Sequence, residues 1–292
     1  MSANQPSYSI SVVERDTGIS RDTLRVWERR YGYPQPERND KGERIYPEMQ
    51  LRYLQRIRRL LDQGMRPGKI FAMSEQEINQ LEQSLHSPEV NLESAGIVGD
   101  LLERLLTGQQ AELIDELNAA YKYYGMEAFI LRVVVPLLQA VGNEWAMGQL
   151  KIYHEHILTQ SLIRLMSVEI DKLQITAKKP LVMLTTLPGE QHAMGLYMMA
   201  GMLSHHGLSA IQAGVEMPMD QINDAATALQ VDIVGLTFSS AYQYSSIRSH
   251  LTELRALLPE DIEIWAGGEG VRRLRKLPHG IQKFTDLEQL PF

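Results

Sequence analysis

Alternating strand-like and helix-like segments in residues 178–292 constrain the fold more than any other feature of the chain. The apolar runs "PLVMLTT", "LSAIQAG", "DIVGLTF" and "EIWAGG" are separated by amphipathic stretches, and "KFT" adds a last short strand-like segment. Strands that alternate with helices predict a parallel sheet covered by helices on both faces. Ligands of such sheets bind beside the carboxyl ends of the strands. We therefore expect an α/β domain over 178–292 whose functional loops follow its strands.

The middle of the chain, residues 76–177, has an almost entirely helical pattern. Amphipathic stretches such as "SAGIVGDLLERLLTG", "QQAELIDELNAAYKYYG" and "MEAFILRVVVPLLQAVGNEWAMG" follow one another with short glycine-bearing connections. Short connections between helices are typical of bundles, and we expect a four-helix bundle here. Pro136 is expected to kink its helix, because proline lacks the amide hydrogen of the helical ladder.

Residues 1–75 form a basic, helix-rich module. The first 70 residues hold 14 Lys and Arg against 9 Asp and Glu, whereas the remainder holds 15 against 27. "ISVVERDTGIS" predicts a short helix ended at Gly18, and Ser20 is a good N-cap for a second helix, "RDTLRVWERRYG". The prolines and "DKG" of "YGYPQPERNDKGERIYP" predict a hairpin, and "EMQLRYLQRIRRLLDQG" an amphipathic helix. Together these elements make a winged helix-turn-helix.

Composition limits the classes of protein to which the chain can belong. It has no cysteine, which excludes disulfides and thiolate metal sites and suits a reducing cytoplasm. "MSANQPSYS" lacks the charged and apolar regions of a signal peptide. No apolar run approaches the roughly 20 residues of a membrane span. We expect a cytoplasmic protein with no membrane partner.

The N-terminal pattern resembles the MerR family of transcription regulators. The likeness covers "YSISVVERDTGISRDTLRVWERRYG" and "PERNDKGERIYP", and continues into "LRYLQRIRRLLDQG". It implies a double-stranded DNA operator as partner, with the second helix in the major groove and the hairpin beside it. An alternative for each arginine is an ion pair with Asp22 or Glu28 on a solvated face. Residues expected at bases are Arg21, Thr23 and Arg25, and those expected at phosphates are Arg29, Arg30, Arg44 and Tyr46.

Three pieces at the ends of expected strands resemble the signature of cobalamin-binding domains, which have a flavodoxin- or Rossmann-like fold. The signature reads acidic-x-His-x-x-Gly, then Ser-x-Leu, then Gly-Gly. Between the pieces lie 41 and 27 residues. The chain departs from the pattern in having Glu for the commoner Asp, Thr for Ser, and Ser for Leu. The matching positions are Glu190, His192, Gly195, Thr237, Ser239, Gly267 and Gly268.

The resemblance implies a role for each of these residues. His192 would bind the cobalt, since imidazole is a good ligand for borderline transition metals, and Glu190 would fix its tautomer. Gly195 would leave room for the nucleotide tail of the cofactor. The hydroxyls of the second piece would contact that tail, and the glycines of the third would let it approach the backbone. The alternative is a relic domain without cofactor, in which His192 merely caps a helix.

A second pattern lies in the expected bundle, where Trp145 precedes Glu155 and His156 by nine intervening residues. It resembles the light-sensing, adenosylcobalamin-dependent MerR regulators of the CarH/LitR type. That resemblance implies that the bundle caps the upper face of the corrin, with Trp145 on the adenosyl group and Glu155 at its ribose. Taken alone, Trp145 fits a core position, and a zinc pair of His154 and His156 is disfavoured because i, i+2 positions face different sides. In those photoreceptors a histidine commonly follows the tryptophan, whereas this chain has Ala146.

These patterns bear on three candidate functions. The first is a transcription repressor whose sensor binds adenosylcobalamin and, in light, changes oligomeric state and releases DNA; its partners would be DNA and further copies of the chain, as a dimer or tetramer. The second is a cobalamin-independent regulator controlled by a protein partner such as a blue-light flavoprotein. Ala146 and Ser239 favour the second, and the retained His192 opposes it. The third, a corrinoid enzyme, is not expected, because the chain has no room for a substrate domain such as a barrel.

Two further histidines stand outside all these motifs. His205 and His206 precede Gly207 at an expected helix end. Positive charge suits the carboxyl end of a helix, and the pattern assigns them no function.

Overall fold

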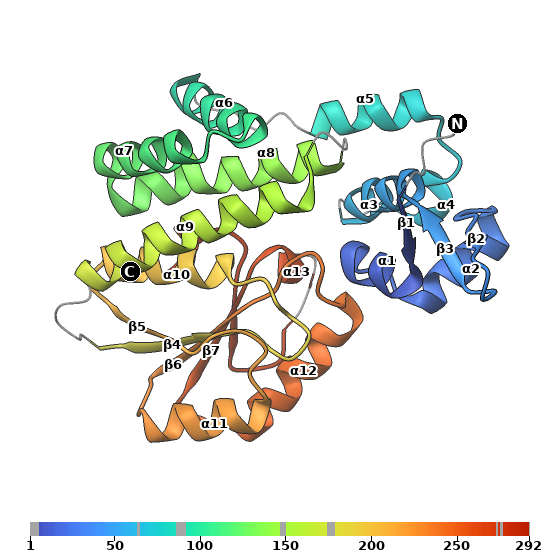
Figure 1. The fold of residues 1–292 in the computed structure, drawn as a ribbon. Helices are drawn as coiled ribbons and strands as arrows, with labels where there is room; N and C mark the ends of the chain where they lie inside the picture. The colour runs from blue at the N-terminus through green and yellow to red at the C-terminus, as the bar shows by residue number, and fades with distance from the viewer. Residues whose placement is uncertain are drawn as a thin grey trace. The chain divides into compact units, whose positions relative to one another are not determined.

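The computed structural model describes residues 6–62, 65–85, 92–146, 150–173, 179–272, 274 and 277–291. The chain divides into two compact units, residues 1–95 with 142–151, and residues 96–141 with 152–292 (Figure 1). Each unit is described in turn.

Near the start of the first unit, two helices are joined by a tight turn, α1 (Ile10–Thr17) and α2 (Arg21–Tyr31). The Ser20 hydroxyl accepts a hydrogen bond from the Thr23 amide at 3.2 Å and so caps α2, as predicted. Gly18 ends α1 in the left-handed conformation, with φ of 63°, which glycine adopts without strain. The cap and the glycine together set the turn between the helices.

A small antiparallel sheet follows, in the order β1-β3-β2. Its strands are β1 (Ser7–Ser9), β2 (Glu37–Arg38) and β3 (Arg44–Pro47). The predicted hairpin is β2–β3, closed by a hydrogen bond from the Asn39 amide to the Glu43 carbonyl at 3.0 Å. The sequence did not reveal β1, which is only three residues long and has no apolar alternation.

Three more helices complete the unit: α3 (Glu48–Asp62), α4 (Pro67–Ile70) and α5 (Glu75–Leu85). Apolar side chains from all of these helices, from α1 and α2 and from β3 form one core. Its members include Val13, Ile19, Leu24, Trp27, Tyr46, Leu54, Ile57, Ile70 and Ile78.

The structure contradicts the placement of Tyr46 at a DNA phosphate. Its side chain is 1% exposed and lies in this core. Burial raises the pKa of its phenol, with smaller effects from neighbouring charges. The sequence pattern placed Tyr46 on the hairpin surface, whereas β3 is the central strand and turns this ring inward.

The second unit contains a five-stranded parallel sheet in the order β5-β4-β6-β7-β8. Helix α10 (Met194–His205) lies on one face, and α11 (Met219–Ala228) and α12 (Tyr244–Leu257) lie on the other, with the short α13 (Glu269–Arg272) after β7 (Figure 1). The predicted parallel sheet is confirmed. The strands are β4 (Leu181–Thr185), β5 (Ser209–Gln212), β6 (Ile233–Thr237), β7 (Glu263–Gly267) and β8 (Ile281–Phe284), and a short 3-10 helix, Leu287–Gln289, follows.

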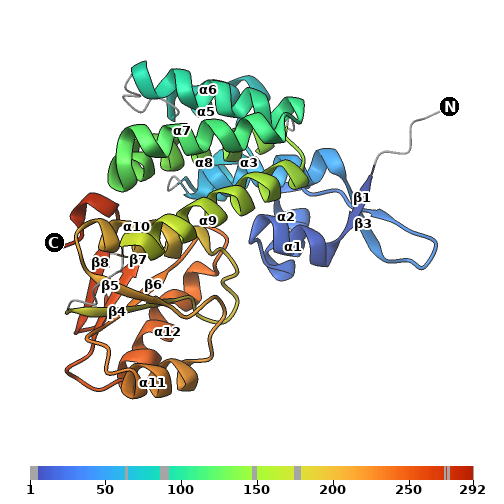
Figure 2. The ribbon, with the colours of Figure 1, turned by 60° about the vertical axis from the view of Figure 1, so that its left-hand side comes forward.

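The helices before the sheet are α6 (Leu92–Thr107), α7 (Gln110–Phe129), α8 (Val135–Ala146) and α9 (Ile152–Leu173). Gly125, with φ of 70° and ψ of 174°, breaks α7. The irregularity expected at Pro136 is a π-helical turn, Ile130–Val134, just before it. Within the unit, α10 packs against α9 and α7, so helices also cover the outer side of α10 (Figure 2).

One helical stretch, Gln110–Glu144, is long and apolar enough to pass a test for membrane spans based on length and composition. It is interrupted by Gly125 and by the π-helical turn. Its first segment, α7, packs against α9 and α10, as a core helix does. The stretch is therefore weak evidence for a membrane span.

Tyr46 offers a test of the core assignment. Replacing Tyr46 with Ala is expected to destabilise the first unit by about 3–5 kcal/mol, as for other large buried rings. Tyr46→Phe keeps the ring and should cost less than about 1.5 kcal/mol. Amide hydrogen exchange of residues 6–81, read by mass spectrometry, measures both. A Tyr46→Phe protein of normal stability but weakened DNA binding would contradict this assignment, since its hydroxyl would then contact DNA.

Candidate functional site

The candidate cofactor site lies where the strand order of the sheet reverses. Strand β4 has β5 on one side and β6 on the other, so the loops after β4 and β6 diverge at this point. Such a switch point is where α/β sheets bind ligands. The loop after β4 carries Glu190 and His192, and the loop after β6 carries Ser239. The structure brings these three residues together.

A buried carboxylate joins the two loops. Glu190 is 1% exposed. One oxygen, Oε1, accepts hydrogen bonds from the His192 amide at 3.0 Å and from His192 Nδ1 at 2.6 Å, and Oε2 accepts one from the Ser239 amide at 2.6 Å. Burial alone would raise the pKa of Glu190, but these hydrogen bonds outweigh it and leave the pKa below its usual value. The carboxylate is therefore ionised at neutral pH.

The ring of His192 is oriented by that carboxylate. The hydrogen bond with Glu190 raises the pKa of His192, and the nearby charges of Glu190 and Glu155 add to the shift. An ionised carboxylate only accepts hydrogen bonds, so Nδ1 bears the proton and the neutral ring keeps its lone pair on Nε2. The Ser239 hydroxyl lies 3.1 Å from Nδ1 as well. Because the side chain is 60% exposed, Nε2 is the nitrogen available to a metal.

Gly195 and Thr237 meet beside this pair. A Cβ atom on Gly195 would lie 3.0 Å from Cβ of Thr237, so the glycine makes room for threonine, whereas the sequence suggested open space for a cofactor tail. In the described part of the chain, Thr237 Oγ1 and Asp16 Oδ2 are the buried side-chain oxygens without a hydrogen-bond partner. An unpaired buried hydroxyl costs about 1–3 kcal/mol. Thr237 is thus a position where a polar ligand group would be stabilising.

The two glycines after β7 permit a close approach to β6. Gly267 ends β7, and Gly268 has φ of 94°. A side chain on Gly268 would overlap the Phe238 carbonyl. Sequence reasoning missed Gly270, whose amide donates to that carbonyl at 2.9 Å and whose Cβ would lie 2.8 Å from the Ser239 carbonyl. These glycines bring the loop after β7 against the loop after β6.

A polar network that the sequence did not reveal fixes the histidine loop. The Thr186 hydroxyl donates to the Glu190 carbonyl at 2.6 Å and accepts from the Glu216 amide at 2.8 Å. The Glu216 carboxylate accepts from the Gly189 amide at 3.2 Å. Glu216 has φ of 56°, which is uncommon outside glycine. In the sequence, the one signal of this network is Thr186, which directly follows β4.

Of the residues expected above the corrin, Glu155 and His156 lie in the first turns of α9. Glu155 is half-buried; its Oε2 lies 2.7 Å from His156 Nδ1, and its Oε1 accepts from the Thr159 hydroxyl at 3.0 Å. His154 is buried and His156 exposed, so they face different sides as expected. The effect of Glu155 on the His192 pKa puts it within electrostatic reach of the histidine loop. The side chains of Trp145 and Ala146 lie outside the described residues.

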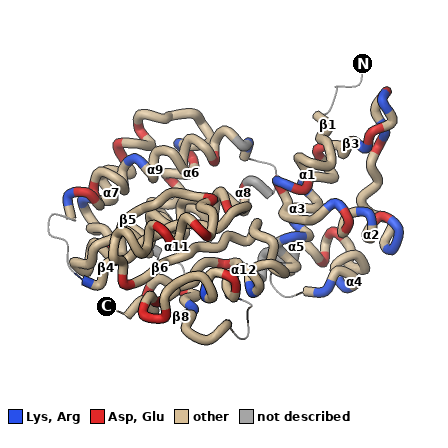
Figure 3. Tube along the Cα trace, turned by 90° about the horizontal axis from the view of Figure 1, so that it is seen from below, with Lys and Arg blue, Asp and Glu red and all other residues tan. Residues whose placement is uncertain are grey.

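The candidate nucleic-acid interface is α2 with the hairpin. Four arginines of α2 are exposed, which gives the helix a basic surface (Figure 3). Thr23 is half-buried and shares a hydrogen bond with the Ser20 hydroxyl at 2.8 Å. The exposed arginines are Arg21, Arg25, Arg29 and Arg30.

Three of the predicted DNA-binding arginines make ion pairs within this unit. Arg25 pairs with Asp22 at 3.3 Å and Arg44 with Glu28 at 3.4 Å, which are the pairs that the sequence left open. Arg21 pairs with Glu14 at 2.6 Å. Exposed pairs of this kind contribute little to stability, so they can give way to phosphates.

Comparison with known proteins agrees with this division of the chain. Residues 8–77 match the model of the MerR HTH family regulatory protein, and residues 97–168 and 180–278 match two models described as B12 binding domain. The chain combines a MerR-type DNA-binding domain with B12-binding domains. The match over residues 97–168 shows that the helices before the sheet also belong to the B12-binding region.

Relatives of similar length support the same assignment. The chain is 28% identical to the HTH-type transcriptional repressor CarH of Myxococcus xanthus over 91% of this chain and 90% of that protein. It is 26% identical to the repressor CarA of the same organism, over 90% and 87%. The monomethylamine corrinoid protein of Methanosarcina barkeri shares the fold, with a TM-score of 0.52 and 15% identity over 66% of this chain and 94% of that one. Both sequence relatives are named as repressors, in agreement with a regulator rather than an enzyme.

Glu190→Gln tests the electrostatics of the candidate cofactor site in cofactor-free protein. Removing the charge beside the ring is expected to lower the raised pKa of His192 toward the ordinary value of a histidine. NMR titration of the histidine rings measures this, with the signal assigned from a His192→Gln variant. The ring signals of the exposed His279 provide the control. An unchanged pKa for His192 would mean that Glu190 is not ionised next to it.

Proposed function

We propose that the chain is a transcription repressor that binds operator DNA through its MerR domain and adenosylcobalamin through its B12-binding region. One observation carries the proposal. A histidine at the switch point of the sheet has Nδ1 bound by a buried, ionised glutamate, which leaves Nε2 for a metal. This is how proteins orient histidine ligands.

The residues around the switch point fit a corrinoid. His192 would bind cobalt through Nε2, with Glu190 as its orienting partner. The unpartnered Thr237 hydroxyl would gain a hydrogen bond from the cofactor tail, beside Ser239 and the loop of Gly267 and Gly268. Thr237 occupies the space beside Gly195, so a movement of Thr237 would be needed before Gly195 could leave room for the cofactor tail. Trp145, Glu155 and His156 would lie on the upper face of the corrin ring, opposite His192.

The fold offers a path from this site to the rest of the chain. Bound adenosylcobalamin would supply a cobalt–carbon bond that light can break. Helix α10 begins two residues after His192 and packs against α7 and α9. A change at the histidine loop would therefore displace helices of the B12-binding region. A ligand drives such a change only through different affinities for two states.

We propose that the two states differ in self-association. A dimer or tetramer would bind repeated half-sites with higher avidity, and its loss in light would release DNA. On the DNA side, Arg21, Thr23 and Arg25 would contact bases, and Arg29, Arg30 and Arg44 phosphates. A regulator of this kind works in the cytoplasm, where the chromosome lies.

A second candidate function follows from one residue. Ala146 directly follows Trp145, where a second cobalt ligand would be needed for a bis-histidine light product. A regulator without that product would answer to a protein partner, such as a blue-light flavoprotein, that binds the C-terminal region.

An absorption spectrum separates these two functions. Protein purified in the dark is mixed with adenosylcobalamin, freed of excess, and recorded before and after green light. We expect retained cofactor with the spectrum of histidine-ligated, base-off cobalamin, lost in His192→Ala and kept in the control His279→Ala. Light should then change the spectrum and reduce DNA binding. Absence of retained cofactor in the unmodified protein would sink the cobalamin proposal and favour the protein partner.

Arg29→Gln tests the DNA interface. A lost phosphate contact should weaken binding to an in-vitro-selected operator and to a scrambled duplex alike, and reduce the slope of log K against log salt by about 1. Fluorescence anisotropy over a salt series measures the slope. Arg248→Gln, an exposed arginine of α12, is the matched control. A slope that changes equally in both variants would argue against α2 as the interface.

A further inference from the structure

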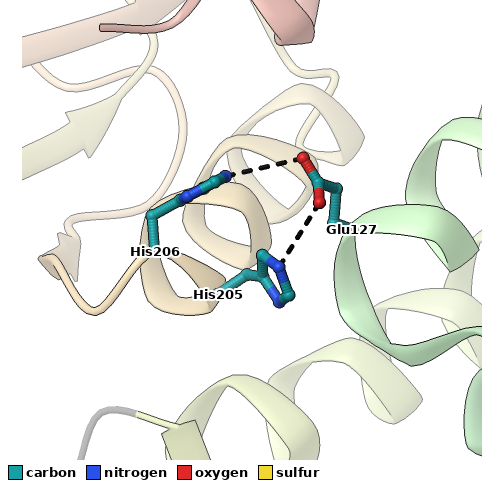
Figure 4. Close-up of side chains that lie close together, drawn as sticks. All are labelled: Glu127, His205 and His206. Atoms are coloured by element: carbon teal, nitrogen blue, oxygen red, sulfur yellow. Dashed lines mark ion pairs between the residues drawn. The ribbon is translucent and has the colours of Figure 1, made fainter. Parts of the chain in front are cut away.

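Three side chains that no part of the proposed function uses come together at the end of α10. His205 is the last residue of α10, His206 follows it, and Glu127 lies in α7. Nε2 of His205 lies 3.3 Å from Oε2 of Glu127, and Nε2 of His206 lies 3.5 Å from Oε1 (Figure 4). One ligand atom of each residue lies within 4.8 Å of the other two.

Local structure explains why these residues meet. Gly125 breaks α7, so Glu127 belongs to the first turn after the break. Gly201, one turn before His205, lets α10 approach that segment; its Cβ would lie 2.7 Å from Cδ1 of Ile130 and 2.9 Å from Sδ of Met126. The spacing of the two helices is thus set by core packing. Core packing therefore brings Glu127 near the end of α10.

The chemistry of the cluster is that of a three-ligand zinc site. Two imidazoles and one carboxylate bind zinc in many proteins, with a fourth position left to water. Metal–ligand bonds of about 2.0–2.1 Å in a tetrahedron separate the ligand atoms by about 3.3 Å. The two nitrogen–oxygen distances are close to that value but join the rings to different oxygens of Glu127, so the side chains must rotate slightly to place one oxygen and both nitrogens around one ion. The side chains are 31–41% exposed, so an ion can enter and the rings can rotate onto it.

We propose that Glu127, His205 and His206 form a binding site for a divalent transition-metal ion such as Zn²⁺. The ion joins the helix after Gly125 to the end of α10, within the second unit. Imidazole nitrogens select such ions over Mg²⁺ and Ca²⁺, which prefer oxygen ligands. The site is separate from His192 and needs no cobalamin.

Zinc titration of the full-length, tag-free, EDTA-treated protein tests the proposal, with a chromophoric chelator as competitor. We expect one tightly bound Zn²⁺ per chain, lost in Glu127→Gln and in His205→Ala. His192→Ala and His279→Ala should retain it. Zn²⁺, but not Mg²⁺, should raise the melting temperature of the unmodified protein and leave that of Glu127→Gln unchanged.

Melting curves in EDTA show whether each variant is folded. Glu127→Gln and His205→Ala change different ligands, so each one tests the site by itself. Zinc binding that persists in both would overturn the proposal. Its loss in His192→Ala would place the ion at the switch point of the sheet instead. Absence of tight binding in the unmodified protein would leave only an ion pair at this position.

Discussion

The carboxylate of Glu190 is the charge on which the candidate cofactor site depends. An ionised carboxylate removed from water costs several kcal/mol unless hydrogen bonds replace its hydration. Here three N–H groups do so, two from the loop after β4 and one from the loop after β6. The same bonds therefore satisfy the charge, join two loops and choose the nitrogen that His192 presents. Removing any one of them would leave a buried charge with too few partners.

The elements of the fold could be predicted from the sequence because their periodicities are strong. Strands β4 and β6 are nearly continuous apolar runs, as strands covered on both faces should be. Gly18 and Ser20 marked helix boundaries through their local chemistry. Helix α4 and strand β1 gave no comparable signal, since four and three residues are too few for a period to show.

The contacts within the candidate cofactor site were predicted only in part. Glu190, His192 and Ser239 were brought together as the signature implied. The space beside Gly195 was not, because that glycine faces a threonine from another strand. Tyr46 failed for a similar reason: whether its ring faces inward depends on the undetected strand β1, which makes β3 central. Contacts between distant segments, such as that of Thr186 with Glu216, cannot be predicted from any local sequence pattern.

Helix α10 connects the two sites of the second unit. It starts just after the histidine that would bind cobalt and ends at the histidines that would bind zinc. A 12-residue helix moves as a nearly rigid body, because its core contacts are close-packed on both sides. A metal ion at its far end would resist displacement of α10 from α7 and so oppose any change that begins at His192. The two ligands would then be coupled, each altering the affinity of the chain for the other by the same factor.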